Sequence, residues 1–507
     1  MSRDGLTATP PASQTFDHKE IKAVVAGLML TILLGALDQT IVSVALPKMA
    51  ADLGSAGLLA WVVSGYLIAM AVTTPLYGKL GDIYGRRVML MWALSIFLLA
   101  SIACALAPSM HFLVLARIAQ GLGGGGIISL SQAIIADVVS PRERGRFQGY
   151  ISAAFAIASV SGPLLGGLLT SYLSWRWVFW INLPLGAAAI FVSHRTLRRL
   201  HTPRVKRPVD YPGAVFMILS LTPLLVAVTR AGQGSGWLDA LNLQMFGATL
   251  IAMALFLWQE KRASEPVVPL ALFKNSTVSL SCTVMFIAFI VLVSLSVMIP
   301  LRAQMLLGVK ADEAGLQLVP FSLCIPIGAY FSGKLASHTG RFKYIQLAGT
   351  LGVPLALLGL TLIDAQHIAA TLACLAFAGI SIGLQLPTST VGVQNAVAQH
   401  HMGIATAVVA FCRSLGAAIG VAVLMAILMA TLHDPTGRLS GAEIIKQLVA
   451  SAGHGPMGDL PAITLAASAQ GAFDGVFVLM AGVACISIVL TLMLRNEILG
   501  EQAPRPD

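Results

Sequence analysis

Fourteen apolar stretches, most of them about 20 residues long or longer, follow one another along this 507-residue chain. A helix of about 20 apolar residues crosses the hydrocarbon core of a bilayer. The stretches lie near residues 23–47, 58–77, 88–107, 112–137, 147–172, 178–194, 213–230, 241–259, 277–300, 314–333, 343–363, 368–390, 403–430 and 473–494. Charged residues make up only 11% of the chain, compared with about 25% in soluble domains. The sequence therefore predicts an all-α polytopic membrane protein with 14 transmembrane helices.

One short polar loop occurs twice. Residues Gly78–Arg87 (GKLGDIYGRR) separate the second and third stretches, and a weaker copy, Gly333–Arg341 (GKLASHTGR), separates the tenth and eleventh. The copies are eight helices apart, which predicts two six-helix bundles with an inserted helix pair between them. An internal repeat of this kind is typical of secondary transporters.

The repeat also predicts the domain boundaries. We expect a cytoplasmic tail at 1–22, a six-helix bundle at 23–200, a linker with the inserted pair at 201–275, a second six-helix bundle at 276–495, and a cytoplasmic tail at 496–507. Within the second bundle, an external segment at 431–472 precedes the last span, and residues 442–449 in it resemble a short surface helix.

The distribution of charge predicts the orientation. An even number of spans puts both termini on one side, and most of the 32 lysines and arginines fall in segments on that side. The positive-inside rule places these segments, and both termini, in the cytoplasm. The net charge of +10 does not indicate nucleic-acid binding, because the charges are confined to short links between apolar spans.

Asp38 is an acidic residue within the first span, roughly 21 Å along a hydrocarbon core about 30 Å thick. A carboxylate at such a depth costs at least about 2.5–3.5 kcal/mol, and burial makes a carboxyl group bind a proton more readily. We interpret Asp38 as a proton-coupling or cation-sensing acid that faces a water-filled cavity. The alternative is an acid held by hydrogen bonds with Gln39 and Thr40.

Two arginines also fall inside spans. Arg117 precedes a glycine-rich run in the fourth span, and an intramembrane cation needs a partner or water. It could tune a nearby acid or bind backbone carbonyls, and the sequence does not determine whether it meets Asp38. Arg413 is the corresponding cation of the second half, with a conformational and a structural role both open.

The fifth span contains Gly149, Gly162, Pro163 and Gly166. Proline removes a backbone donor and bends a helix, and the glycines leave it pliable. We interpret this span as a hinge-like contact surface between the two halves, with tight helix packing as the alternative.

Asp137 ends the fourth span, close to the first loop in the predicted topology. We expect it to pair with Arg86 or Arg87 as a conformational latch, although a plain surface ion pair is worth only about 0–1 kcal/mol. The aromatic segment Trp175–Pro184 is interpreted as an interfacial belt of indoles.

Several chemistries have no signature in the sequence. We find no catalytic triad, and the six cysteines lie in apolar spans without metal-ligand spacing. Gly123–Gly126 do not form a nucleotide loop, because no Lys-Ser/Thr follows them. The sequence therefore predicts no enzyme, no metal and no ATP-driven pump.

Four of these segments resemble the major facilitator superfamily, in particular its fourteen-helix drug:proton antiporter branch. Gly78–Arg87 is similar to the superfamily's loop between helices 2 and 3, and Leu37–Pro47 to the branch's helix 1 motif. Arg117–Gly121 is similar to the helix 4 motif, and Gly149–Gly167 to the antiporter motif of helix 5. The resemblance covers about residues 25–495 and implies a fold of two six-helix bundles plus an inserted pair.

The resemblance also implies roles for single residues. Asp82 and Arg86 would stabilise one access state, and Arg117 would be linked to proton transfer. Ala158 stands where the antiporter motif usually has glycine, and Ser337 replaces the acid of the second loop. The second departure implies that gating is concentrated in the first half.

From these observations we expect a proton-coupled exporter of amphipathic or cationic organic compounds (multidrug efflux) in the cytoplasmic, or inner, membrane. Asp38 and Arg117 would serve proton coupling. Conformational gating would involve Gly78, Asp82, Gly85, Arg86, Arg87, Asp137, Gly162, Pro163, Gly166 and Arg413. The proton gradient would supply the energy without a cofactor.

The expected partners are the substrate, protons and lipid, and no nucleic acid. A periplasmic adaptor and an outer-membrane channel cannot be inferred from the sequence. The alternatives are a dedicated exporter of an endogenous metabolite or siderophore, and a receptor or channel that keeps this fold without pumping.

Overall fold

The computed structural model describes residues 18–54, 58–139, 141–199, 208–232, 234–398, 401–432, 444–445 and 460–496. Within these ranges it contains 14 candidate spans, each long and apolar enough to cross a membrane. The helices are α1 (His18–Leu53), α2 (Leu59–Tyr84), α3 (Arg86–Ala105), α4 (Met110–Val138), α5 (Pro141–Tyr172), α6 (Trp177–Trp180), α7 (Asn182–Thr196), α8 (Tyr211–Gly232), α9 (Ala240–Arg262), α10 (Ser276–Leu307), α11 (Ala311–Leu316), α12 (Val319–Thr339), α13 (Lys343–Leu362), α14 (Ile368–Asn395), α15 (Met402–Thr431) and α17 (Leu460–Met493), with short 3-10 turns at Leu197–Arg199 and Leu270–Lys274. The predicted number of spans is confirmed.

Several helix ends differ from the prediction, because apolar composition does not mark where a helix continues beyond the bilayer. The last helix, α17, begins at Leu460, inside the segment 431–472 that the sequence predicts to be external. Helix α10 continues to Leu307, beyond the predicted end of the ninth span near residue 300, and includes Arg302, which is 3% exposed. The predicted surface helix at 442–449 lies almost wholly outside the described residues.

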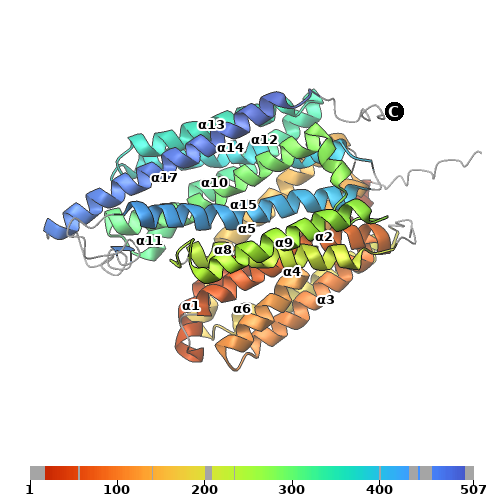
Figure 1. The fold of residues 1–507 in the computed structure, drawn as a ribbon, viewed down its shortest axis with the longest axis horizontal. Coiled ribbons are helices and arrows are strands. Elements are labelled where there is room, and N and C mark those ends of the chain that lie inside the picture. Colours follow the sequence, from red (N-terminus) through yellow and green to blue (C-terminus); the bar gives the residue numbers. More distant parts are fainter. Residues whose placement is uncertain are drawn as a thin grey trace, which may run out of the picture.

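The helices form two halves with the inserted pair beside their junction (Figure 1). Helices α1–α7 make one half, and α10–α17 make the other. The inserted pair packs through α8 against α2 of the first half and α15 of the second. The halves contact each other mainly through α2 with α15 and α5 with α12. The repeat makes α2 equivalent to α12 and α5 equivalent to α15, so these two contacts are equivalent to each other.

The two copies of the polar loop share one backbone feature. Gly85, between α2 and α3, has φ 94°, and Gly340, at the matching place between α12 and α13, has φ 67°. Residues with a β-carbon rarely adopt such angles. The repeat seen in the sequence is therefore also a repeat of the turn that reverses the chain.

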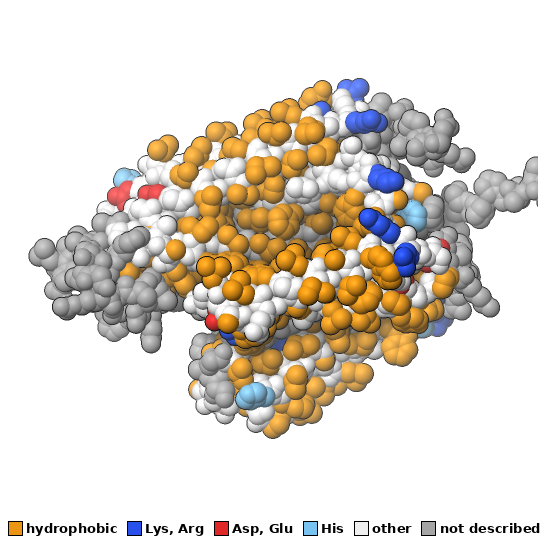
Figure 2. All heavy atoms as spheres, viewed as in Figure 1, with side chains coloured by type: hydrophobic (Ala, Val, Ile, Leu, Met, Phe, Trp, Pro, Cys, Tyr) orange, Lys and Arg blue, Asp and Glu red, His pale blue; other side chains and the backbone are white. Residues whose placement is uncertain are grey.

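The halves touch closely at the end that carries Gly78–Arg87, which we call the loop end. There Gly78 lies against Gly403 and Ala407 of α15, and Gly149 of α5 lies against the backbone of Tyr330 in α12. Exposed lysines and arginines gather at the same, right-hand edge of Figure 2. Toward the opposite, or far, end the two halves diverge (Figure 1). In this conformation the loop end is closed.

Two of the apolar clusters in the first half follow one another along its length. One, toward the loop end, includes Leu28, Phe97 and Ile134, and the other, toward the far end, includes Val62 and Phe179. A layer of buried polar side chains lies between them, and it contains Asp38.

Candidate functional site: a buried charge pair and a latch between the halves

Asp38 is fully enclosed by protein, with 0% of its surface exposed. Arg117 donates from Nη1 to its Oδ2 at 2.7 Å. Gln120 and Asn182 donate to its Oδ1 at 2.9 and 2.8 Å. The four side chains come from α1, α4 and α7, so the carboxylate joins three helices of one half.

Arg117 is equally buried, at 1% exposed. Its Nε donates to the carbonyl of Val62 at 3.2 Å, and its Nη1 also donates to Gln120 Oε1 at 2.8 Å. The ring of Tyr66 covers the guanidinium, with 4.2 Å between Cζ and the ring centroid. Both charges are thus neutralised locally. Removing only one partner of a buried pair typically costs about 3–5 kcal/mol, because the other charge is left unpaired.

Two expectations about Asp38 are corrected by this geometry. It does not face a water-filled cavity in this conformation, because no part of its side chain is exposed. The residues that donate to it lie on other helices, while Gln39 donates to the carbonyl of Gly35 and Thr40 to that of Ala158. Whether Asp38 exchanges protons remains a prediction.

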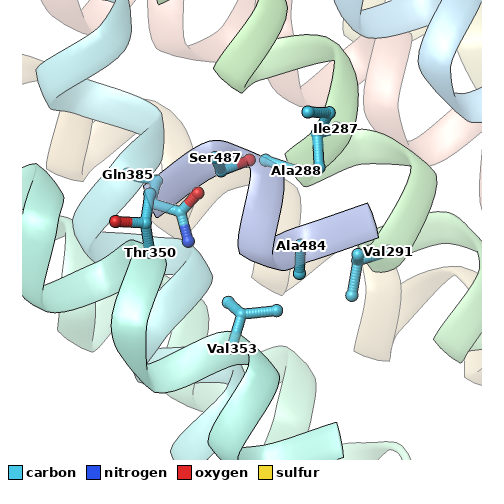
Figure 3. A pocket seen from close by; sticks show the side chains of 8 residues that line it. All are labelled: Ile287, Ala288, Val291, Thr350, Val353, Gln385, Ala484 and Ser487. Carbon is cyan, nitrogen blue, oxygen red and sulfur yellow. The ribbon is translucent and has the colours of Figure 1, made fainter. Parts of the chain in front are cut away.

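The second half has a small gap among the helices that correspond to those of the charge pair. The repeat relates α1, α3, α4 and α7 to α10, α13, α14 and α17, and these four helices also meet around a small gap (Figure 3). Its lining is Ile287, Ala288, Val291, Thr350, Val353, Gln385, Ala484 and Ser487. The lining of this gap is apolar or neutral polar, without a charge pair like that of Asp38 and Arg117.

A second constellation lies at the loop end, around Arg86, which is 3% exposed. Its Nη2 donates to Asp82 Oδ1 at 2.9 Å, its Nη1 to the carbonyl of Ala133 at 2.7 Å, and it forms an ion pair with Asp137. The predicted pairing of Asp137 with this loop is therefore present, through Arg86. The guanidinium of Arg87 lies against His194 in α7 instead, and its part in gating stays a prediction.

Asp82 also reaches across to the other half. Its Oδ2 accepts a hydrogen bond from the backbone N–H of Ile404 at 3.0 Å, in the first turn of α15. A helix N-terminus carries unpaired N–H groups and a partial positive charge, both of which favour a carboxylate. A methyl group at Gly403 would collide with this carboxylate. The contact joins the halves and holds the loop end closed in this conformation.

A third contact ties the loop to the segment that follows the inserted pair. Lys79 donates from Nζ to Glu265 Oε2 at 2.8 Å, and the two side chains are 10% and 22% exposed.

At the start of α5, Arg144 donates to the carbonyl of Ala136 at 2.7 Å. Burial lowers the pKa of Arg144 to about 10, so this guanidinium is charged at neutral pH.

The glycines of α5 do not all lie where we expected. Gly162 and Gly166 pack against Thr40 and Ile41 of α1, within the same half. Close packing on α1 is therefore what Gly162 and Gly166 permit, whereas the span as a whole does contact the other half, through Gly149 against Tyr330 of α12. A part of Gly162, Pro163 and Gly166 in gating stays a prediction.

Trp175 differs from expectation, whereas the part of Arg413 in gating stays a prediction. Among the residues that the structure describes, Arg413 has no hydrogen bond or ion pair that could act as a gate. Trp175 is not part of an interfacial belt: it is 1% exposed and donates from Nε1 to Asp52 at 2.8 Å.

Sequence reasoning did not single out Gln120, Asn182 or Glu265. Gln120 had a usable signal, since residues three apart on a helix share a face and Gln120 follows Arg117 by three. Asn182 is an amide within an otherwise apolar run, which is itself a sign of a buried hydrogen-bond partner.

Comparisons with known proteins agree with this architecture. The family model described as Major Facilitator Superfamily matches residues 28–421. The multidrug transporter protein MdtP of Bacillus subtilis is 32% identical over 401 residues, which cover 78% of this chain and 73% of MdtP. An uncharacterised MFS-type transporter of Mycobacterium tuberculosis is 33% identical over 399 residues, which cover 78% of this chain but only 58% of that relative.

The solved structure of the proton:xylose symporter XylE superimposes with a TM-score of 0.64 at 14% identity, over 96% of this chain and 98% of XylE. Such low identity supports the fold alone. The match to the family model and the 14 candidate spans show that this multi-pass membrane protein belongs to the major facilitator superfamily, a family of transporters and not of enzymes.

Proposed function

We propose that this transporter is a proton-coupled exporter of amphipathic organic compounds that works by alternating access in the cytoplasmic membrane. The observation that carries the proposal is the pair of Asp38 and Arg117, isolated between two apolar clusters. Stability alone does not favour such a pair, because well-packed apolar residues are often equal or better. MdtP, similar over most of this chain, is named a multidrug transporter, which supports an export role.

The pair provides a way to link a proton to a conformational change. Protonation of Asp38 removes the negative charge that holds Arg117, and the guanidinium must then find other acceptors. Val62 and Gln120 already accept from it, but neither carries a charge. A proton therefore changes the forces between α1, α4 and α7, and a state that re-forms the pair favours proton release. Each charge that crosses the membrane is worth about 2.3 kcal/mol per 100 mV.

The contact of Asp82 with the N-terminus of α15 would define one of the two access states. It is a small contact that can break and re-form, as alternation requires. With both termini in the cytoplasm, the closed loop end would be the cytoplasmic end, and protons would enter from the far end. Substrate, protons and lipid would be sufficient partners.

The test is Asp38→Asn in inside-out vesicles that carry an imposed pH gradient. We expect this variant to lose uphill accumulation of substrate and to keep counterflow, which needs no proton. Because Asp38→Asn leaves Arg117 unpaired, a double variant, Asp38→Asn with Arg117→Gln, keeps the site neutral and should behave in the same way. Asp52→Asn is the matched control with the same chemical change, and should pump normally.

If either Asp38 variant still accumulates substrate on a pH gradient, Asp38 is not the coupling acid. A panel of unrelated amphipathic dyes separates the alternatives. A dedicated metabolite exporter would ignore the dyes, and a channel would equilibrate them without uphill accumulation.

A further inference from the structure

Arg413 lies near the middle of a membrane-spanning helix. It stands 11 residues after the start of α15, or about 17 Å along the helix axis, close to half the thickness of the hydrocarbon core. A charge at this depth is expensive unless it faces protein or water, and it marks a functional site by default.

The guanidinium lies between the two halves. Its Cζ is 5.8 Å from the ring centroid of Phe155 in α5, and 5.4 Å from that of Phe289 in α10. All three side chains keep part of their surface exposed. Arg413 thus sits at the junction around which the halves move, with an aromatic ring from each half beside it.

No carboxylate neutralises Arg413 within the described part of the chain. Helices α10, α12, α14 and α15 contain no aspartate or glutamate at all. In the first half, Asp38 is held by Arg117, and Asp82 and Asp137 are held by Arg86. The space between the halves at this depth therefore carries an unbalanced positive charge.

This charge bears on the kind of compound that the transporter takes. A cationic substrate between the halves would meet a like charge where water screens poorly. An anionic one would supply the missing partner, and a guanidinium can bind a carboxylate or sulfonate through two parallel hydrogen bonds. The rings of Phe155 and Phe289 offer faces against which an apolar or aromatic body can pack.

We propose that Arg413 binds the anionic group of an amphipathic substrate, and that this transporter therefore prefers organic anions to organic cations. The inference deepens the proposed export function and rests on it. It replaces the expectation of cationic substrates.

The experiment measures equilibrium binding to the purified full-length protein in nanodiscs, without a pH gradient. The probes are naphthyl compounds that share one ring system and end in a carboxylate, a sulfonate or a trimethylammonium group. We expect the anionic probes to bind at least about 10-fold more tightly than the cationic probe. Arg413→Gln should weaken anion binding by about 10-fold to 100-fold, the worth of a charged hydrogen bond. Arg413→Glu should reverse the preference.

Two controls separate this effect from loss of structure. Arg413→Lys keeps the charge, so it should retain much of the anion preference. Arg230→Gln removes a positive charge from α8, where Arg230 pairs with Asp239, and should leave the preference unchanged. Thermal unfolding checks that each variant folds.

Equal binding of the anionic and cationic probes, no binding of any anionic probe, or an unchanged preference in Arg413→Gln would each overturn the inference. The vesicle assay with Asp38→Asn tests the proposed function separately. If Asp38→Asn still accumulates substrate while the Arg413-dependent preference is intact, proton coupling through Asp38 fails and this inference stands.

Discussion

Replacing Asp82 by asparagine should open the loop end. The substitution keeps the size of the side chain but removes the charge that meets the first turn of α15. The charge pair with Arg86 is lost within the first half, but Arg86 stays paired with Asp137 and with the carbonyl of Ala133. Between the halves, the loss is the contact with Ile404 N at 3.0 Å.

The size of the effect follows from that contact. A carboxylate at a helix N-terminus contributes about 0.3–1 kcal/mol when exposed and up to about 2 kcal/mol when partly buried. The side chain of Asp82 is 14% exposed, which places it toward the upper part of this range. A loss of about 1–2 kcal/mol changes the ratio of closed to open molecules by roughly 5-fold to 30-fold.

Pulsed electron resonance can measure this ratio with spin labels at Tyr84 and Tyr344, in a background without native cysteines. Both positions lie at the loop end, one in each half, and both are exposed, at 45% and 61%, so labels there should not disturb the contact. In Asp82→Asn we expect a longer-distance component to gain population by the factor above.

The control for this prediction is Asp52→Asn. Asp52 makes its contacts with Trp175 and Arg176 within one half, so the same chemical change there should leave the distances unaltered. A distribution in Asp82→Asn that matches the unmodified protein, or an equal shift in the control, would refute the reasoning that this carboxylate holds the halves together.

Two further predictions concern packing and the third contact at the loop end. Gly162→Ala should lower the thermal unfolding temperature, since the new methyl group meets Thr40 and overpacking costs about 1–3 kcal/mol. Gly167→Ala, with nothing within 4 Å, should be neutral or stabilising, and a similar loss in both variants would contradict the packing argument. Lys79→Gln and Glu265→Gln should each favour the open loop end. The effect of the double variant on the free energy of opening should be smaller than the sum of the two single effects, by a coupling energy of about 1 kcal/mol between the two side chains. Additive effects on the spin-label populations would show that this ion pair does not act as a unit.

The transmembrane architecture was predictable from the sequence for a simple physical reason. Backbone groups inside a bilayer must be satisfied within their own segment, so a long apolar run there has to be a helix. The end of a helix outside the bilayer has no such constraint. Accordingly, the sequence does not predict that α17 begins at Leu460 or that α10 extends past Arg302.

The candidate site was predictable in its members but not in its contacts. A charge inside a span stands out in any apolar sequence, so Asp38, Arg117 and Arg413 were found at once. Asp38 and Arg117 are 79 residues apart, and no spacing along the chain tells that their helices cross at that depth. Likewise, the glycines of α5 indicated a close approach, but only the fold shows that α1 is the neighbour.

By itself, the sequence determined the number of spans, the repeated turn and which residues bear charge within the membrane, because these depend on local composition and on the cost of placing a residue in lipid. Tertiary structure alone decided which charges neutralise each other and which one is left over. That outcome depends on how helices distant in the chain are rotated and crossed. Packing pairs Asp38 with Arg117 and brings Asp82 to the start of α15, and it leaves Arg413 between the halves without an acidic partner in the described chain.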